Sequence, residues 1–333
     1  MMIVLLAGCN PQVATSFWRI GTPADSTKKG YTIIHAEGKT RHCYPVDEWK
    51  ADPAIDTYHQ MHHHGVAVES DKMAYRIYFD KKQTIDPYCK RVPQLELATS
   101  YWYPNDSLLA AHYGDDILRV SGTVGVGSVK YWNGKKHVHI EPVAERSQRI
   151  VKQSRKSATI EVAVEDWQVE GKMVDMDVQY TMQGSHRDMR CDVYLSEEVE
   201  GLCTGVQMIP NNGKSPRSLG GSHDTIIVVP NGTILASWGT DWPVNDSAKF
   251  AKETVGLAVF IPIEHAGVPV RDKRNNLCLL KQEKAQNGYS THFYLTCVGA
   301  SKEDQPVASN ATEWYAYLRK WAKKLPDSQL LKQ

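Results

Sequence analysis

The chain has 333 residues and a formal net charge of +1 at pH 7, with 39 Lys and Arg against 38 Asp and Glu. This balance excludes the basic stripe that is typical of nucleic-acid-binding proteins. The length allows one large β domain or two ordinary domains. After the first residues, no stretch approaches the roughly 20 apolar residues that span a bilayer.

The first residues have the pattern of a lipoprotein signal. A short apolar run ends in Leu-Ala-Gly-Cys at Cys9, the lipobox pattern in which the thiol takes a diacylglycerol. A charged n-region is missing, and the alternative is a buried N-terminal strand with a chance cysteine. Residues 10–16 are predicted to be a structureless tether. We therefore expect an exported lipoprotein of the periplasm or outer membrane, held by its lipid alone. Residues 1–20 would be signal and tether, and 21–333 a single domain.

The other six cysteines include no CxxC pair, so a structural zinc site of that type is not expected. In an exported protein some of them could pair. Cys191 and Cys203 are the closest in sequence, and we predict a disulfide between them.

Short runs of alternating apolar and polar residues dominate the chain, and this is the pattern of β-strands. The predicted strands are 73–80, 125–131, 158–167, 173–182, 188–195, 225–229, 233–238 and 289–298. Asn231-Gly232 predicts a hairpin turn. Helices are expected only at 105–113 and 310–324. The pattern predicts a mainly β protein, a large antiparallel β-sandwich with few helices.

Three consecutive histidines, 62–64, form the most unusual local feature. On a strand, His62 and His64 would share one face and His63 would take the other. Imidazoles at this spacing can bind a metal ion or exchange protons near neutral pH. The alternative is a His-rich surface loop.

The strand predicted at 73–80 carries the next candidates. Alternation places Tyr75, Ile77 and Phe79 on the core face, and Arg76, Tyr78 and Asp80 on the other face. Arginine can grip a carboxylate with two hydrogen bonds, and a deprotonated tyrosine can act as a base. The alternative is a solvent-exposed face with an Arg–Asp pair.

A turn predicted at 111–116 overlaps the end of the first predicted helix and contains His112, Tyr113, Asp115 and Asp116. It joins two proton-transfer groups to two carboxylates, which could hold calcium through oxygen ligands. An Asp-rich turn with a capping role explains the same pattern equally well.

Two weaker candidates lie further along the chain. Arg187 stands in a charged segment between two strands, where a hairpin turn is the favoured interpretation. Trp238 and Trp242 flank a carboxylate and could form a sugar platform, or simply a bulge anchored in the core.

The segment from His62 through Lys82, followed by Ile85-Asp86 and Lys90, resembles the bacterial domain-of-unknown-function family 4861. The runs 115–120, 125–127 and 256–259 are also similar to it. Cys89 is a departure, because a glycine is expected in this turn. The resemblance implies a fold like the galactose-mutarotase supersandwich. It also implies an exported protein that takes part in the breakdown of pectin-like, uronate-containing polysaccharide.

The first hypothesis is an enzyme that acts on an acidic oligo- or polysaccharide as a lyase or a glycoside hydrolase. A lyase needs a base and a cation beside the uronate carboxylate, whereas a hydrolase needs two carboxylates about 5–10 Å apart. The candidates are Arg76 as carboxylate grip, Tyr78, His112 or Tyr113 as base or acid, His62 and His64 as proton-transfer groups or metal ligands, and Asp80, Asp115 and Asp116 for hydrolysis. No cofactor is certain, and a divalent calcium or zinc ion stays open.

Three alternatives remain: a non-catalytic glycan-binding lipoprotein, a sugar epimerase of the mutarotase type, and a structural envelope protein. An enzyme requires its candidate residues to converge in one place, whereas a glycan-binding protein requires only aromatic rings on an open face. Arg187, Trp238, Trp242 and Asp80 would contact the sugar in either case.

Overall fold

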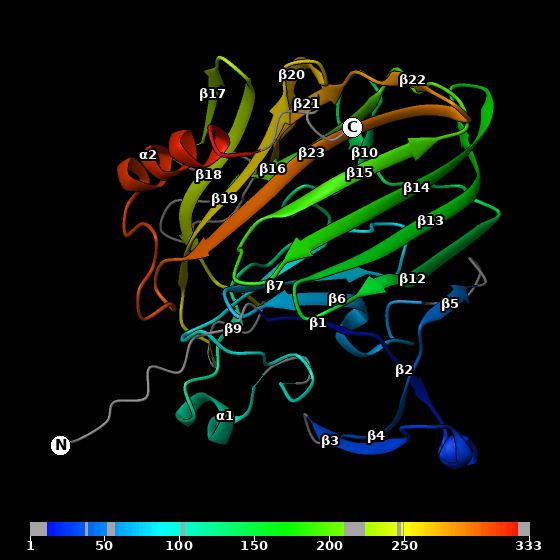
Figure 1. Ribbon diagram of the computed structural model, residues 1–333, viewed down its shortest axis with the longest axis vertical. Helices are drawn as coiled ribbons and strands as arrows, with labels where there is room; N and C mark the ends of the chain where they lie inside the picture. The colour runs from blue at the N-terminus through cyan, green and yellow to red at the C-terminus, as the bar shows by residue number, and fades with distance from the viewer. Residues whose placement is uncertain are drawn as a thin grey trace.

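The computed structural model describes residues 12–36, 39–51, 57–100, 104–209, 224–244, 248 and 250–325 (Figure 1). Strands dominate, and every named pair of strands is antiparallel. Cys9 lies outside the described residues. Within them, no helix is long and apolar enough to cross a membrane.

A ten-stranded sheet forms the largest layer, in the order β17-β18-β19-β23-β15-β14-β13-β12-β5, with β22 paired to β23. Its strands are β5 (Glu48–Ala51), β12 (Glu145–Gln153), β13 (Ser157–Val169), β14 (Lys172–Gln183), β15 (Met189–Leu195), β17 (Thr225–Val229), β18 (Gly232–Asp241), β19 (Glu253–Pro262), β22 (Glu283–Ala285) and β23 (Gly288–Gly299).

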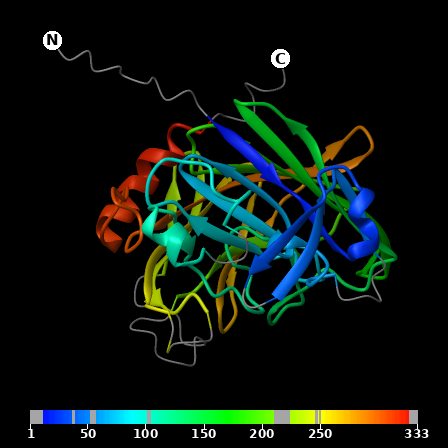
Figure 2. The ribbon, with the colours of Figure 1, turned by 90° about the horizontal axis from the view of Figure 1, so that it is seen from below.

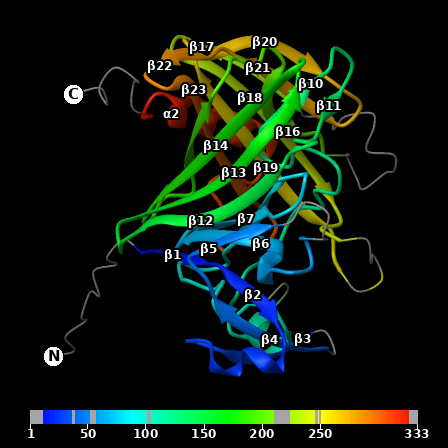
Figure 3. The ribbon, with the colours of Figure 1, turned by 90° about the vertical axis from the view of Figure 1, so that its right-hand side faces the viewer.

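A second sheet, which we call the central sheet, has the order β1-β6-β7-β8-β9. It consists of β1 (Val13–Ser16), β6 (Gly65–Ser70), β7 (Met73–Tyr78), β8 (Ile85–Cys89) and β9 (Asp115–Asp116). It lies between the large sheet and a three-stranded sheet, as the side view shows (Figure 3). The three-stranded sheet, of order β2-β4-β3, contains β2 (Trp18–Gly21), β3 (Thr32–Ala36) and β4 (Lys39–Pro45).

The remaining elements complete the molecule. A further sheet of order β11-β10-β16-β21-β20 contains β10 (Lys130–Trp132), β11 (His137–Val138), β16 (Leu202–Gln207), β20 (Ala266–Arg271) and β21 (Asn275–Leu280). The helices are α1 (Asp106–Ala110) and α2 (Ala311–Ala322), with the 3-10 turns η1 (Pro23–Thr27) and η2 (His62–His64). Helix α1 and the three-stranded sheet lie on the same side of the central sheet, away from the large sheet (Figures 1 and 2).

The main hydrophobic core lies between the large sheet and the central sheet. Val66 and Ile77 of the central sheet belong to the same buried cluster as Val162, Val178 and Phe293 of the large sheet. Removing such apolar surface from water stabilises the fold by roughly 25 cal/mol per Å². The predicted class is therefore confirmed: this is a mainly antiparallel β-sandwich with few helices. Its finer assignment as a supersandwich stays a prediction.

Helix α2 covers the outer face of the large sheet. Its buried residues Trp314, Leu318 and Trp321 pack in a second hydrophobic cluster with Phe260. Gly256 permits this close approach, because a Cβ atom there would lie 2.8 Å from the Trp314 ring. The helix predicted at 310–324 is confirmed, with Asn310 as its N-cap, accepting a 3.0 Å hydrogen bond from the Glu313 amide.

Four local predictions were wrong. Residues 13–16 are not a structureless tether, because they form β1 and pair with β6. The strand predicted at 125–131 is reduced to β10, since Gly125 and Gly127 have φ values of +57° and +76°. The first helix ends at Ala110, and His112 has a φ of +62°.

The fourth error is the disulfide. Each of the six cysteines in the described ranges is a buried free thiol. Cys191 lies on β15 of the large sheet, whereas Cys203 lies on β16 of a different sheet. The chain changes sheets between the two residues, so they do not lie on paired strands.

Candidate functional site

One face of the central sheet carries mostly ionisable and aromatic residues. Antiparallel register places Ala67, Arg76 and Asp86 side by side across three strands. Residues directly opposite each other in such strands share a face. We define the charged face as Glu69, Arg76, Tyr78, Asp86, Tyr88, Lys90 and Asp116, all of which are buried. The opposite face of the same strands belongs to the main hydrophobic core.

Two segments cover the charged face. The His63 ring hydrogen-bonds through Nε2 to the Leu97 carbonyl, 2.8 Å away, so the histidine turn and the segment that follows β8 touch each other. The Glu69 carboxylate accepts hydrogen bonds from the amides of Glu96 and Leu97 at 2.8 and 3.0 Å. Burying charge is costly unless it is paired. A face with this much buried charge is therefore a candidate functional site.

Arg76 lies at the centre of the charged face, with its side chain only 2% exposed. Its Nη2 donates to Asp86 Oδ2 at 2.8 Å and to Asp116 Oδ2 at 2.6 Å. The guanidinium also lies over the Tyr88 ring, 5.8 Å from its centroid. Sequence alternation correctly put Arg76 opposite the core residues. However, its predicted role as the grip on a substrate carboxylate is not supported, because two protein carboxylates already hold it.

The two carboxylates that share Arg76 are unusual acids. Burial raises the pKa of Asp86 to about 7 and the Asp116 carboxylate adds to this increase, whereas Arg76 and Tyr78 oppose it. Burial also raises the pKa of Asp116, against the effect of Arg76. The pair can therefore retain a proton near neutral pH, which ordinary aspartates cannot do.

A line of hydrogen bonds leads from this pair toward the surface. The Tyr78 hydroxyl donates to Asp86 Oδ2 at 2.6 Å, and Tyr78 in turn hydrogen-bonds the half-buried Tyr58. Burial raises the pKa of Tyr58 to about 12, so its phenol is protonated at neutral pH. Lys82 lies over the ring of Tyr58, with Nζ 4.7 Å from the centroid, and pairs with Asp80 at 3.1 Å.

His64 completes this surface end. Its ring stacks on Tyr58, with centroids 3.7 Å apart, and its Nδ1 donates to the Tyr58 carbonyl at 2.9 Å. This bond assigns the proton to Nδ1 and the basic lone pair to Nε2. Burial lowers the pKa of His64 to about 3, so the ring is neutral at physiological pH. We call Tyr58, His64, Tyr78 and Lys82, together with Asp86, the acid–base network.

The histidine segment is not a strand. It forms the turn η2, in which His63 and His64 have φ values of +57° and +61°. The expectation that His62 and His64 share a strand face is therefore wrong. His62 is buried, and burial lowers its pKa to about 3. His64 alone of the two is partly open to solvent.

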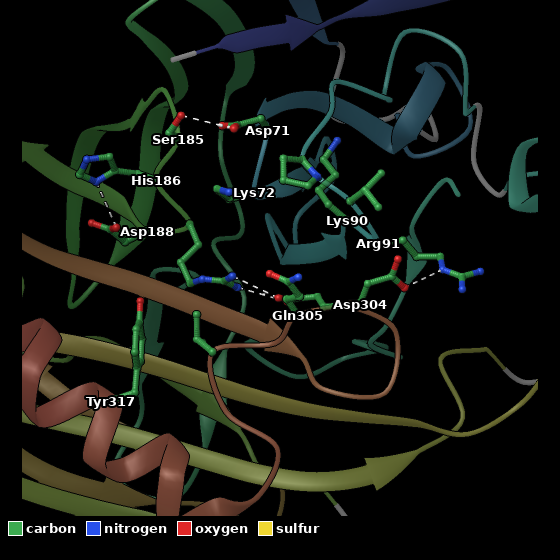
Figure 4. Close-up of a pocket in the computed structure, with 15 residues that line it drawn as sticks. Asp71, Lys72, Lys90, Arg91, Ser185, His186, Asp188, Asp304, Gln305 and Tyr317 are labelled. Atoms are coloured by element: carbon green, nitrogen blue, oxygen red, sulfur yellow. Dashed lines mark hydrogen bonds and ion pairs between the residues drawn. The ribbon is translucent and has the colours of Figure 1, made fainter. Parts of the chain in front are cut away.

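A cleft of about 560 Å³ opens at the other end of the charged face (Figure 4). Lys90 lines it and binds the Glu69 carboxylate behind it. Arg187, predicted to bind substrate, also lines the cleft, but Glu303 holds its guanidinium through two hydrogen bonds of 3.1 and 3.2 Å. Lys72 faces the cleft from the β6–β7 turn.

Other predicted residues lie outside the acid–base network. His112 is exposed, 3.9 Å from Asp304 at the rim of the cleft. Tyr113 hydrogen-bonds Thr99 at 3.0 Å. Trp238 is buried in the cluster under α2, whereas Trp242 is half-buried beside Lys252, whose Nζ lies 4.4 Å from the ring centroid.

The predicted calcium pair is not supported either. Asp115 Oδ2 lies 3.5 Å from the Lys302 ammonium, while Asp116 binds Arg76. These two carboxylates already have cationic partners, and calcium prefers a cage of six to eight oxygens.

Sequence reasoning did not assign Tyr58, Lys82 or Asp86 to the site. Asp86 carried a usable signal, since a carboxylate inside the apolar run of β8 needs a buried partner. Tyr58 carried no such sequence signal, because its position beside Tyr78 depends on how the chain before η2 packs.

Fold and site together define a β-sandwich protein with a buried acid–base network at one end of its central sheet. The chain belongs to the family described as Domain of unknown function (DUF4861), whose model matches residues 15–328. No curated protein matches the sequence.

A solved structure with some similarity is the family-36 α-galactosidase AgaA of Geobacillus stearothermophilus in complex with raffinose, at 11% identity and a TM-score of 0.27. The match covers 70% of this chain and 41% of that enzyme, so the chain spans about two fifths of the enzyme's length.

Proposed function

We propose that this protein is a carbohydrate-active enzyme that cleaves uronate-containing glycans by β-elimination. The observation that carries the proposal is the hydrogen-bonded line from half-buried Tyr58 through Tyr78 to Asp86, beside neutral His64 and the Lys82 ammonium. These are the groups that an elimination requires: a base, an acid and a cation.

The chemistry assigns one role to each group. His64 would take the proton from the carbon beside the uronate carboxylate, while Lys82 would offset the charge that develops on the carboxylate. The bond to the leaving oxygen would break as the ring double bond forms, and Tyr58 would protonate that oxygen. Asp86 would then give a proton to the Tyr78 oxygen while the Tyr78 hydroxyl, which donates to Asp86 at rest, turns and gives its own proton to Tyr58. His64 would release the abstracted proton to solvent, from which Asp86 would be reprotonated.

Hydrolysis is less well supported by the same geometry. It needs two carboxylates open to the substrate, but the side chains of Asp86 and Asp116 are only 1% and 5% exposed, and both bind Arg76. Asp80 is more open, at 18%, and pairs with Lys82.

The test is a screen of acidic polysaccharides that follows unsaturated-uronide absorbance and reducing ends together. We expect the wild-type protein to produce both signals and His64→Ala to lose them. The matched control is His35→Ala, which removes an exposed histidine of β3 and should keep full activity. Reducing ends without absorbance would indicate hydrolysis. Binding without turnover on any substrate would leave the glycan-binding function.

Export and lipid anchoring through Cys9 belong to the same proposal and rest on the lipobox pattern. Cys9→Ser should move the protein from the membrane fraction to the soluble fraction of cells, because the thioether to the lipid can no longer form. Fractionation with an antibody against the protein measures this. An unchanged distribution would refute the anchor without affecting the proposed chemistry.

A further inference from the structure

A compact group of nitrogen and oxygen donors lies on the large sheet, apart from the charged face. Glu264 and His265 stand in the turn between β19 and β20, and His292 lies on β23. One ligand atom from each residue lies within 4.8 Å of the other two. His265 and His292 are only 3% and 6% exposed, and their ring centroids are 4.6 Å apart. We propose that these three residues form a binding site for a divalent transition-metal ion of the Zn²⁺ type.

Backbone contacts fix His265 in an orientation suited to metal binding. The Lys281 amide donates to the His265 carbonyl at 2.9 Å, and His265 Nδ1 donates to the Lys281 carbonyl at 3.2 Å. With the proton on Nδ1, the lone pair is on Nε2. Metal-bound histidines are typically oriented in this way, by a carbonyl that accepts from the second ring nitrogen.

The donor set selects the type of ion. Two imidazoles and one carboxylate suit Zn²⁺, which binds them at about 2.0–2.2 Å. In a tetrahedral site, ligand atoms at that distance from the ion lie about 3.3–3.6 Å apart, so the three side chains, whose ligand atoms now lie within 4.8 Å of one another, must close by up to about 1.5 Å when the ion binds. Calcium is disfavoured, because it prefers six to eight oxygen ligands.

The site lies on the face of the large sheet that carries α2. His292 alternates with Phe293, which points into the main core, and it shares its face with Tyr294 of the cluster under α2. A bound ion would connect the β19–β20 turn to β23 and, through His265, to the chain just after β21. It should therefore stabilise the folded protein, because the three ligands come together only when the chain is folded.

Calorimetric titration of the metal-free protein with Zn²⁺ tests the proposal. We expect one equivalent to bind to the wild type, with a rise in Tm of several degrees. His292→Ala and Glu264→Gln should weaken binding at least tenfold. Co²⁺ in place of Zn²⁺ should give the visible bands of a four-coordinate site.

Two controls separate this site from the other histidines. His35→Ala removes an exposed histidine, and His64→Ala removes one from the histidine turn; both should keep the equivalent of Zn²⁺. Circular dichroism checks that His292→Ala is folded, and Glu264→Gln changes only a half-buried side chain. A wild type that binds no Zn²⁺, or a Glu264→Gln variant that binds as tightly as the wild type, overturns the proposal.

Discussion

Arg76→Met is expected to lower the free energy of unfolding by about 3–5 kcal/mol, the usual effect of removing one partner from a buried ion pair. The substitution keeps much of the side-chain volume but leaves Asp86 and Asp116 facing each other without the cation that both now bind. Urea denaturation measures the change. The control is Arg91→Met, since the exposed pair of Arg91 with Asp304 should be worth less than about 1 kcal/mol.

The loss of unfolding free energy in Arg76→Met should depend on pH in a defined direction. Burial already raises the pKa of Asp86 from 3.8 to about 7, so the folded state holds a proton that the unfolded state releases. Such a group loses its stabilising contribution as pH rises from about 4 through 7. Without Arg76 the pKa of both carboxyls should rise further. The loss of unfolding free energy in Arg76→Met, relative to the wild type, should therefore be larger at about pH 8 than at about pH 5. Equal losses of unfolding free energy in Arg76→Met and Arg91→Met at about pH 8 would contradict the stabilising role given to Arg76 between Asp86 and Asp116.

Local sequence pattern was sufficient for seven of the eight predicted strands and for one feature of the site. Period-two alternation correctly placed Arg76 and Tyr78 opposite Tyr75 and Ile77, because side chains of a strand alternate whatever it packs against. The same pattern could not show that the second face is buried. That depends on the segments around His63 and Leu97, which reach the central sheet from outside its strands.

Partners distant in sequence explain most of the other errors. Arg76 meets Asp116 forty positions away, and Arg187 meets Glu303 even further along the chain. Neither pairing has a periodic signal, so Arg76 was interpreted as the grip on a substrate carboxylate, and Arg187 as part of a charged turn that could contact the sugar. The prediction that His62 and His64 share a strand face was wrong for a local reason. Alternation assumes extended backbone, whereas His64 has a positive φ, which is rare for a residue with a side chain.

Asp86→Asn should lower the rate of glycan cleavage by about 10²–10⁴-fold, the range typical of a lost proton-transfer group. In the proposed elimination, Tyr58 gives its proton to the leaving oxygen. Its pKa of about 12 means that the tyrosinate must be reprotonated at once. The 2.6 Å contact between Tyr78 and Asp86 supplies the path for that proton once the Tyr78 hydroxyl, which donates to Asp86 at rest, turns toward Tyr58. An asparagine at position 86 keeps the shape and a hydrogen bond but has no proton to give.

The pH profile distinguishes this role from a merely structural one. Asp86 must be protonated to act, so activity should fall as pH rises through about 7, the value to which burial raises its pKa. His64, whose pKa is lowered to about 3, stays neutral across that range and therefore does not titrate within this limb. The falling limb should disappear in Asp86→Asn, and the residual rate should be flat through neutral pH. A variant that retains the wild-type limb would show that another group titrates there, and the proton path would then have to leave Asp86 out.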